Sequence, residues 1–246
     1  TGAYKGVNFY GAGSIKAVGN ITINTTTPGA DWSFRLYDSR VMQSTTGNIS
    51  ITASGGYGMY IYGGSIVAGN DLVTPTSGGT ITINSSSFTN DIGSAAIRMD
   101  VDTAKIIAYG NISIYANGAA LGLNTANQQG HGLILYGAQT IRSYRGDLTI
   151  TGYANHADGA VTNWANISGG ITLWSGADTL RAYGNLTLKG VSMGGIGVFL
   201  TYASSTGGSV TADTGNIVID GINNNASYGA TYIRMPITST LGAVSI

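Results

Sequence analysis

The feature that most constrains this chain is a short pattern that returns eight times. It consists of Gly, usually Asn, an apolar residue, usually Ser or Thr, and a second apolar residue, from residues 19–23 to residues 242–246. Successive glycines are 28, 32, 31, 36, 38, 31 and 27 residues apart. A period in this range is typical of a solenoid, in which each repeat adds one structural unit. The pattern therefore predicts a stack of similar units.

Within each copy the two apolar residues flank a residue that is usually a hydroxyl residue. Alternation with a period of two predicts a β-strand with its aliphatic side chains inward and its Ser or Thr outward. β-Branched residues also favour the extended backbone of a strand. The inward positions predict a core made of Ile21, Ile23, Ile49, Ile51, Ile81, Ile83, Ile112, Ile114, Leu148, Ile150, Leu186, Leu188, Ile217 and Ile219.

The first two residues of the pattern predict a tight corner before each strand. Glycine is free to take a positive φ, and an Asn amide can bond the backbone of a turn. We expect such corners at Gly19 and Asn20, Gly47 and Asn48, Gly110 and Asn111, Gly184 and Asn185, and Gly215 and Asn216.

Two further short strands are predicted between successive corners. A middle strand has inward residues at its first and third positions, as in residues 34–37 and 233–236, and another precedes the corner, as in residues 15–17. Three strands per coil are the number found in a parallel β-helix. One coil alone leaves its strand edges unpaired, so coils must stack, at roughly 4.8 Å each. We expect an all-β parallel β-helix with three short strands per coil and about 7–8 coils.

The composition excludes several classes of protein. The 246 residues include 43% hydrophobic residues, 11 Lys and Arg against 11 Asp, and no Glu or Cys. The apolar content excludes disorder, the lack of Cys excludes disulfides, and zero net charge gives no electrostatic reason to expect nucleic acid. No apolar run is long enough to predict a transmembrane helix. Because no linker interrupts the pattern, we expect residues 1–246 to form a single β-helix segment.

The pattern Ala-x-Gly-Asn-Ile-Ser-Ile is clearest at residues 17–23, 108–114 and 182–188. In a chain rich in Gly, Thr, Asn and Ser, it resembles the repeat region of filamentous-haemagglutinin-like bacterial adhesins, and the resemblance covers nearly the whole chain. It implies a right-handed β-helix, export by type V secretion (two-partner secretion or an autotransporter), and display outside a Gram-negative outer membrane. The Asn-Pro-Asn type motif of the family's secretion domain does not occur here. We therefore expect an interior slice of a longer repetitive protein.

Aromatic residues recur at one outward position of the predicted middle strand. Stacked aromatic side chains outside a solenoid commonly cover the sheet, whereas exposed Tyr, Trp and Arg also anchor contacts with partners. Both interpretations stay open. In the second, a glycan or receptor would bind this face or the loops at residues 117–130 and 153–170. The candidate ligand-binding residues are Tyr37, Tyr62, Tyr136 and Trp174, with Arg35, Arg98 and Arg234 two residues earlier in their columns.

An enzymatic interpretation rests on His131, which lies between two glycines. This triplet is similar to the Gly-His-Gly of polygalacturonase-like glycoside hydrolases, whose chemistry needs converging carboxylates. The nearest candidates are Asp100 and Asp102, but that family's Asn-Thr-Asp, adjacent Asp pair and Arg-x-Lys are missing. His156 lies in the longest predicted connection between strands, and the two histidines of the chain do not make a metal site without converging carboxylates. We expect no catalytic residue, no metal and no cofactor.

These observations favour a non-enzymatic shaft segment of a bacterial surface adhesin. Its main partners would be neighbouring coils of the same long chain, together with a host or bacterial cell-surface glycan or protein. The alternatives are a glycan- or receptor-binding β-helix and, third, a polysaccharide-degrading enzyme.

Overall fold

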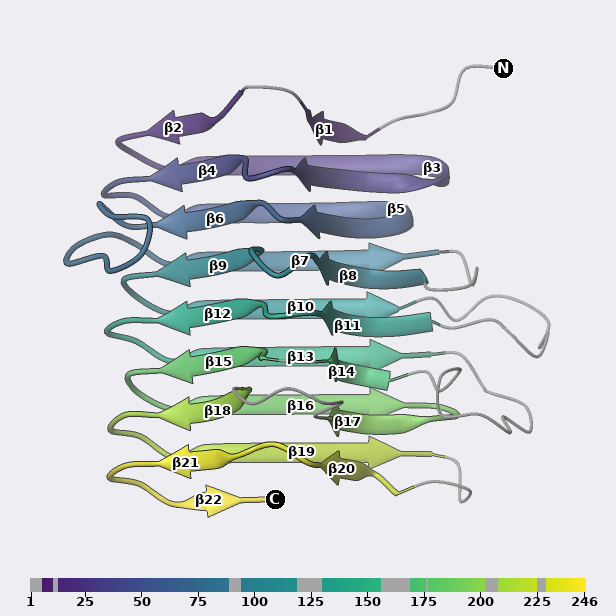
Figure 1. The fold of residues 1–246 in the computed structure, drawn as a ribbon. Coiled ribbons are helices and arrows are strands. Elements are labelled where there is room, and N and C mark those ends of the chain that lie inside the picture. The colour runs from purple at the N-terminus through teal and green to yellow at the C-terminus, as the bar shows by residue number, and fades with distance from the viewer. Residues whose placement is uncertain are drawn as a thin grey trace.

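The chain is all-β in the computed structural model. The structure describes residues 6–10, 13–88, 94–118, 130–155, 169–175, 177–201, 208–224 and 229–246. Within these ranges there is no helix, and the strands form one sheet of 14 strands and one of 8. Every pair of named strands runs parallel. Figure 1 shows the strands stacked in layers from the N-terminus to the C-terminus, as in a β-solenoid.

The strands that follow the Gly-Asn corners form one ladder, which we call the repeat ladder. Equivalent positions of the sequence pattern face each other, so that Ile112 lies opposite Ile81 on one side and Leu148 on the other. The strands of the repeat ladder are β3 (Ile21–Tyr37), β5 (Ile49–Tyr62), β7 (Ile81–Ser87), β10 (Ile112–Gly118), β13 (Leu148–Ala154), β16 (Leu186–Ser192), β19 (Ile217–Asn223) and β22 (Val244–Ser245).

A second ladder, the middle ladder, contains the predicted middle strands. The long strands β3 and β5 continue from the repeat ladder into it, which joins the two ladders into the 14-stranded sheet. Its other strands are β1 (Val7–Phe9), β8 (Ser94–Asp100), β11 (Gly130–Tyr136), β14 (Gly169–Ser175), β17 (Ile196–Leu200) and β20 (Thr231–Ile233).

The third ladder is the separate 8-stranded sheet, and its strands precede the Gly-Asn corners. Each has a large and then a small inward side chain, as in Ile66 and Ala68, which are both fully buried. Its strands are β2 (Ile15–Ala17), β4 (Val41–Ser44), β6 (Ser65–Ala68), β9 (Lys105–Ala108), β12 (Thr140–Ser143), β15 (Thr179–Ala182), β18 (Ser209–Ala212) and β21 (Ile237–Ser239).

One hydrophobic core runs along the stack between the ladders. Of the fourteen core residues named from the sequence, thirteen are buried, and Ile23, near the N-terminal end, is partly buried against the same core. Phe34 and Met59 of the middle ladder and Ile106 of the third ladder belong to this core as well. Burying one such side chain contributes about 1.5–3 kcal/mol, so stability is distributed over every repeat.

The corner glycines do not have the conformation expected from the sequence. None of Gly19, Gly47, Gly110, Gly184 and Gly215 takes a positive φ. Most of these corners need glycine because the preceding repeat packs directly against the Cα and leaves no space for a Cβ. A Cβ on Gly215, for example, would lie 2.5 Å from the backbone nitrogen of Asn185.

The corner amides bond the backbone as expected, and they do so between repeats. The side-chain Oδ1 of a corner residue accepts a hydrogen bond from the backbone N–H of the equivalent residue in the next repeat, at 2.7–3.0 Å. This corner ladder satisfies backbone donors that would otherwise have no partner. The accepting residues are Asn20, Asn48, Asn111, Asp147, Asn185 and Asn216.

The last middle strand has a different register from the one expected. Ile233 pairs with Leu200, which occupies the third position of its strand, so β20 is shifted by two residues. Tyr232 therefore lies opposite Phe199, and the expectation that Arg234 shares a column with Arg35 and Arg98 is wrong. The local sequence allows either alignment, because apolar residues alternate in both.

No helix in the described part of the chain is long and apolar enough to cross a membrane.

Candidate functional site

The outer face of the middle ladder carries the four aromatic residues singled out from the sequence. Tyr37 and Tyr62 are paired in register, with ring centroids 5.7 Å apart. Asp100 pairs with both Tyr62 and Tyr136, so a carboxylate separates the second tyrosine from the third. A register shift after Leu135 places Tyr136 opposite Ser175 instead of Trp174. The four residues therefore do not form one uninterrupted strip.

Near the N-terminus the rings gather into a group that we call the tyrosine cluster: Tyr10, Trp32, Tyr37, Tyr60 and Tyr62. The Tyr10 and Tyr37 rings are stacked with centroids 4.4 Å apart, and those of Trp32 and Tyr60 with centroids 4.9 Å apart. Tyr60 also meets Tyr37 edge to face at 5.6 Å. Offset and edge-to-face pairs of this kind stabilise a fold by about 0.5–1.5 kcal/mol each. The rings of the cluster thus contact mainly one another.

Sequence reasoning missed Tyr10, Trp32 and Tyr60 as members of this surface. The signal for Tyr60 was present, since it alternates with the inward Met59 and Ile61. Trp32 was harder to predict, because the pairing of β3 with β5 shifts register between Thr27 and Trp32.

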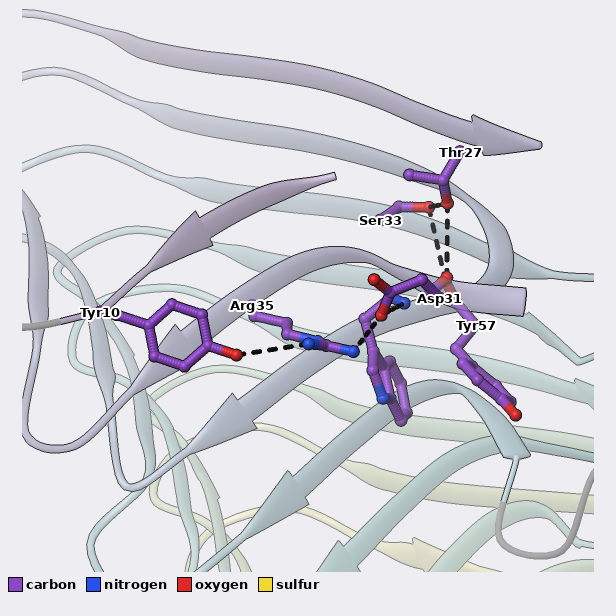
Figure 2. A network of polar contacts seen from close by, with 7 residues as sticks. Tyr10, Thr27, Asp31, Ser33, Arg35 and Tyr57 are labelled. Atoms are coloured by element: carbon purple, nitrogen blue, oxygen red, sulfur yellow. Dashed lines mark hydrogen bonds and ion pairs between the residues drawn. The ribbon is translucent and has the colours of Figure 1, made fainter. Parts of the chain in front are cut away.

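A polar network holds the cluster where β3 turns from the repeat ladder into the middle ladder (Figure 2). The Arg35 guanidinium donates to the Tyr10 hydroxyl at 3.3 Å and forms an ion pair with Asp31. The same Asp31 oxygen accepts a hydrogen bond from the backbone N–H of Trp32 at 2.8 Å. Burial, together with the hydrogen bond to Tyr10, raises the pKa of Tyr37 to about 12, so its hydroxyl is neutral at physiological pH.

Figure 2 also shows the hydroxyl pair beside this network. The Thr27 and Ser33 hydroxyls lie 2.9 Å apart, and Ser33 donates to the Tyr57 carbonyl at 3.4 Å. Both side chains are buried, so each polar atom has a partner where water is excluded.

Asp100 is the polar centre of the next part of the surface. Its Oδ2 accepts hydrogen bonds from the Tyr60 hydroxyl at 2.9 Å and from the Arg98 guanidinium at 2.8 Å. Arg98 also lies over the Tyr136 ring, 4.8 Å from its centroid. Burial and the neighbouring Asp100 charge raise the pKa of Tyr60. The charges of Arg98 and Asp100 therefore compensate each other within this ion pair.

Trp174 links Tyr136 to a further group of rings, because the Tyr136 and Trp174 ring centroids lie 6.4 Å apart. Its ring lies 5.8 Å from Phe199, which stacks on Tyr232 at 5.2 Å. Ile196 and Phe199 are buried in this small second apolar cluster. Of the predicted ligand-binding residues, Tyr62 is the most open, with 36% of its surface exposed, whereas Tyr37, Tyr136 and Trp174 are partly buried. The predicted loops at residues 117–130 and 153–170 lie largely outside the described residues.

The residues of the enzymatic interpretation do not converge. His131 pairs with Ala95, five residues before Asp100 on β8, which separates the two side chains by about 16 Å along the strand. The carboxylates of glycosidases lie roughly 5–9.5 Å apart around the bond they cleave. Asp102 lies in the turn after β8, where it accepts a hydrogen bond from the Ala138 backbone N–H at 3.2 Å. His156 lies outside the described residues.

His131 is instead a buried, neutral side chain. Its Nδ1 accepts a hydrogen bond from the Gly169 backbone N–H at 3.1 Å and lies 3.3 Å from the Thr172 hydroxyl. Burial, with a smaller contribution from the Arg98 charge, lowers its pKa to about 4. In the part of the chain that the structure describes, no three His, Asp or Glu side chains are arranged to hold a metal ion.

A buried carboxylate that sequence reasoning missed is Asp178, between β14 and β15. Its Oδ1 accepts a hydrogen bond from the Gln139 backbone N–H at 3.0 Å, and its buried Oδ2 has no hydrogen-bond partner within the described ranges. Burial raises its pKa to about 7. No periodicity marks this position, because it lies in a connection between strands.

Comparisons with protein-family models, with curated proteins and with solved structures found no match. The arrangement of the aromatic surface alone supports two roles: covering the sheet and presenting rings to a partner.

Proposed function

We propose that this chain is a structural shaft segment of a large exported bacterial surface adhesin. The observation that carries the proposal is the continuity of its contacts from one repeat to the next. The core, the parallel ladders and the corner hydrogen bonds use equivalent positions in successive repeats, so such a stack can be extended without a new kind of contact. A rod built this way holds an attached module away from a surface.

We infer further that the solenoid is a right-handed β-helix of about 7–8 coils. The right-handed twist of strands favours right-handed connections between parallel strands of one sheet. At roughly 4.8 Å per coil, such a rod is about 40 Å long.

The cell-surface location is proposed from the resemblance to filamentous-haemagglutinin-like repeats. A chain without cysteine cannot be trapped by disulfides while it crosses an oxidising periplasm unfolded. The proposed partners are neighbouring coils of the same long chain, and the proposed location is the exterior of a Gram-negative outer membrane.

Small-angle X-ray scattering of the purified chain tests the rod. We expect a cross-section that stays uniform along the particle and a length near 40 Å. Because these two dimensions are similar for a single segment, a tandem fusion of two copies is measured beside it and should have twice the length at the same cross-section. A fusion that folds but thickens, instead of lengthening, would contradict the shaft.

The second candidate function is recognition of a glycan or receptor by the tyrosine cluster and its neighbours. It is favoured by the exposure of Tyr10 (55%) and Tyr62 (36%) on the outer face of the middle ladder. Binding to a glycan panel and to cells is compared between the wild type and a variant with Tyr37, Tyr62, Tyr136 and Trp174 changed to Ala. Saturable binding that the folded variant loses would support recognition by this surface, and binding that the variant keeps would exclude it.

A further inference from the structure

A pocket lies away from the tyrosine cluster, where the third ladder passes into the repeat ladder. The connection between β6 and β7 leaves the stack here as a projecting loop (Figure 1). This loop and the two rungs next to it enclose a space of about 260 Å³. That volume lies just below the roughly 300–1,000 Å³ of pockets for drug-sized ligands, so it suits one small group. The lining residues are Thr74, Pro75, Thr76, Tyr109, Tyr144 and Arg145.

The loop wall of the pocket is held in place by its own side chains. Asn70 Oδ1 accepts hydrogen bonds from the backbone N–H groups of Thr76 and Ser77 at 2.9 and 3.1 Å. Asp71 Oδ1 accepts two more from within the loop, from Val73 at 2.8 Å and from Thr74 at 2.7 Å. A loop with these bonds loses little further entropy when a ligand binds.

The opposite wall consists of tyrosines on successive rungs. The Tyr109 backbone N–H bonds to β6, and the Tyr144 backbone N–H bonds to β9, so the two residues occupy one column. The Tyr144 hydroxyl donates to the Val73 carbonyl and so ties this wall to the loop. Both side chains are partly buried and carry an apolar ring with a polar end.

Two arginines lie at this pocket without an ion-pair partner in the described part of the chain, while the Asp71 carboxylate of the loop wall bonds to the loop's own backbone. Arg145 is exposed and lies 5.0 Å from the Tyr183 ring centroid, and Arg142 lies over Tyr144 at 3.9 Å. No carboxylate among the described residues forms an ion pair with either arginine, and the buried Arg142 Nε has no partner. One rung further on, Arg181 does have its carboxylate, at 2.9 Å from Asp213.

We propose that this pocket binds one residue of an acidic glycan, a sugar ring that carries a carboxylate. The apolar face of the sugar would lie on the tyrosine wall, its hydroxyls would bond Thr74 and Thr76, and its carboxylate would pair with the planar guanidinium of Arg145. A neutral sugar would leave the arginine unpaired, and a bare phosphate would leave the rings uncovered. The proposal does not depend on the shaft function.

Isothermal titration with oligogalacturonate tests the proposal, with neutral oligogalactose and inorganic phosphate as comparison ligands. We expect saturable binding of oligogalacturonate with a dissociation constant on the order of 1 mM, weakened by salt, and binding of neither comparison ligand at that strength. Equal binding of neutral oligogalactose or of phosphate would overturn it, as would no binding by the folded chain.

Variants locate the site. Arg145→Gln should weaken binding at least about tenfold. Arg234→Gln is the matched control, because Arg234 is also exposed but lies just after β20 of the middle ladder, and it should leave binding unchanged. Tyr109→Ala should weaken binding and Tyr109→Phe should preserve it, because the ring and not the hydroxyl is the platform. Binding that Arg145→Gln leaves intact, or that the two Tyr109 variants affect equally, would overturn the assignment to this pocket.

Discussion

At the scale of single residues, each position of the Gly-Asn corner meets a separate requirement of close stacking. The glycine removes a side chain from the place where the preceding repeat passes, and the amide accepts a backbone hydrogen bond that crosses between repeats. The sequence predicted the corner and the amide, but it suggested the wrong reason for the glycine. The distance to the preceding repeat is a property of the stack and has no local signal.

The glycine requirement can be tested by two alanine substitutions. A Cβ on Gly215 would lie 2.5 Å from backbone atoms of the preceding repeat, whereas one on Gly19 meets nothing within 4 Å. We expect Gly215→Ala to lower the free energy of unfolding by about 1–3 kcal/mol, and Gly19→Ala to change it by less than about 1 kcal/mol. Urea denaturation measures both, and similar losses in the two variants would contradict the stacking explanation.

A second prediction concerns His131 and pH. Its pKa is lowered from 6.5 to about 4 in the fold, so the unfolded chain binds the extra proton between these values. The His131 contribution to stability is therefore complete above about pH 6.5 and is lost as the pH falls toward 4. Relative to His131→Asn, which keeps an acceptor for Gly169 but does not titrate, the wild type should lose on the order of 3 kcal/mol over this range.

Denaturation of both proteins at several pH values between 4 and 7 gives this difference directly. Asp178, whose raised pKa acts in the opposite direction, is present in both proteins and cancels. A difference that stays constant with pH would show that His131 is accessible to protons in the folded chain.

At the scale of strands, the two-residue alternation was enough to assign the faces of the repeat ladder. It was weaker for the middle ladder, because bulges near Trp32 and after Leu135 change which residue points outward. The four aromatic residues fall into two pairs, because Asp100 occupies the register position between Tyr62 and Tyr136. Whether the sequence locates a binding residue thus depends on how regular its strand is.

The assignment of faces on β10 can be tested by placing a charge on each face. Ile112 is buried and Ser113 is exposed. Ile112→Asp would bury an unpaired carboxylate and should cost several kcal/mol or prevent folding, whereas Ser113→Asp should stay within about 1 kcal/mol of the wild type. Circular dichroism during thermal unfolding distinguishes them, and equal effects would mean that the faces are assigned incorrectly.

At the scale of the whole molecule, the eight-fold recurrence predicted the parallel stack, because neighbouring repeats must pair with each other to satisfy their strand edges. The projecting loop between β6 and β7 and its pocket could not be predicted. They depend on which side chains of different rungs happen to be neighbours, and this is fixed only when the repeats are in register.

Removal of one repeat is a test at this scale. Deletion of residues 110–145 joins two equivalent corners and should leave a protein that still unfolds cooperatively and is about 4.8 Å shorter by scattering. Deletion of residues 117–152 serves as a second variant. It removes the same number of residues and joins β10 to the equivalent position of β13, so the register of the repeat is kept. If neither variant folds, the repeats are not interchangeable units.

The corner ladder has one interruption, and it gives the stack a seam. Thr80 replaces the usual corner amide, so no side-chain acceptor among the described residues reaches the backbone N–H of Asn111. The chain of corner bonds therefore divides into a shorter and a longer run. The amide proton of Asn111 should exchange with deuterated water much faster than those of Asn48, Asp147 and Asn185. Under tension along the rod, this seam is where we expect the repeats to separate first.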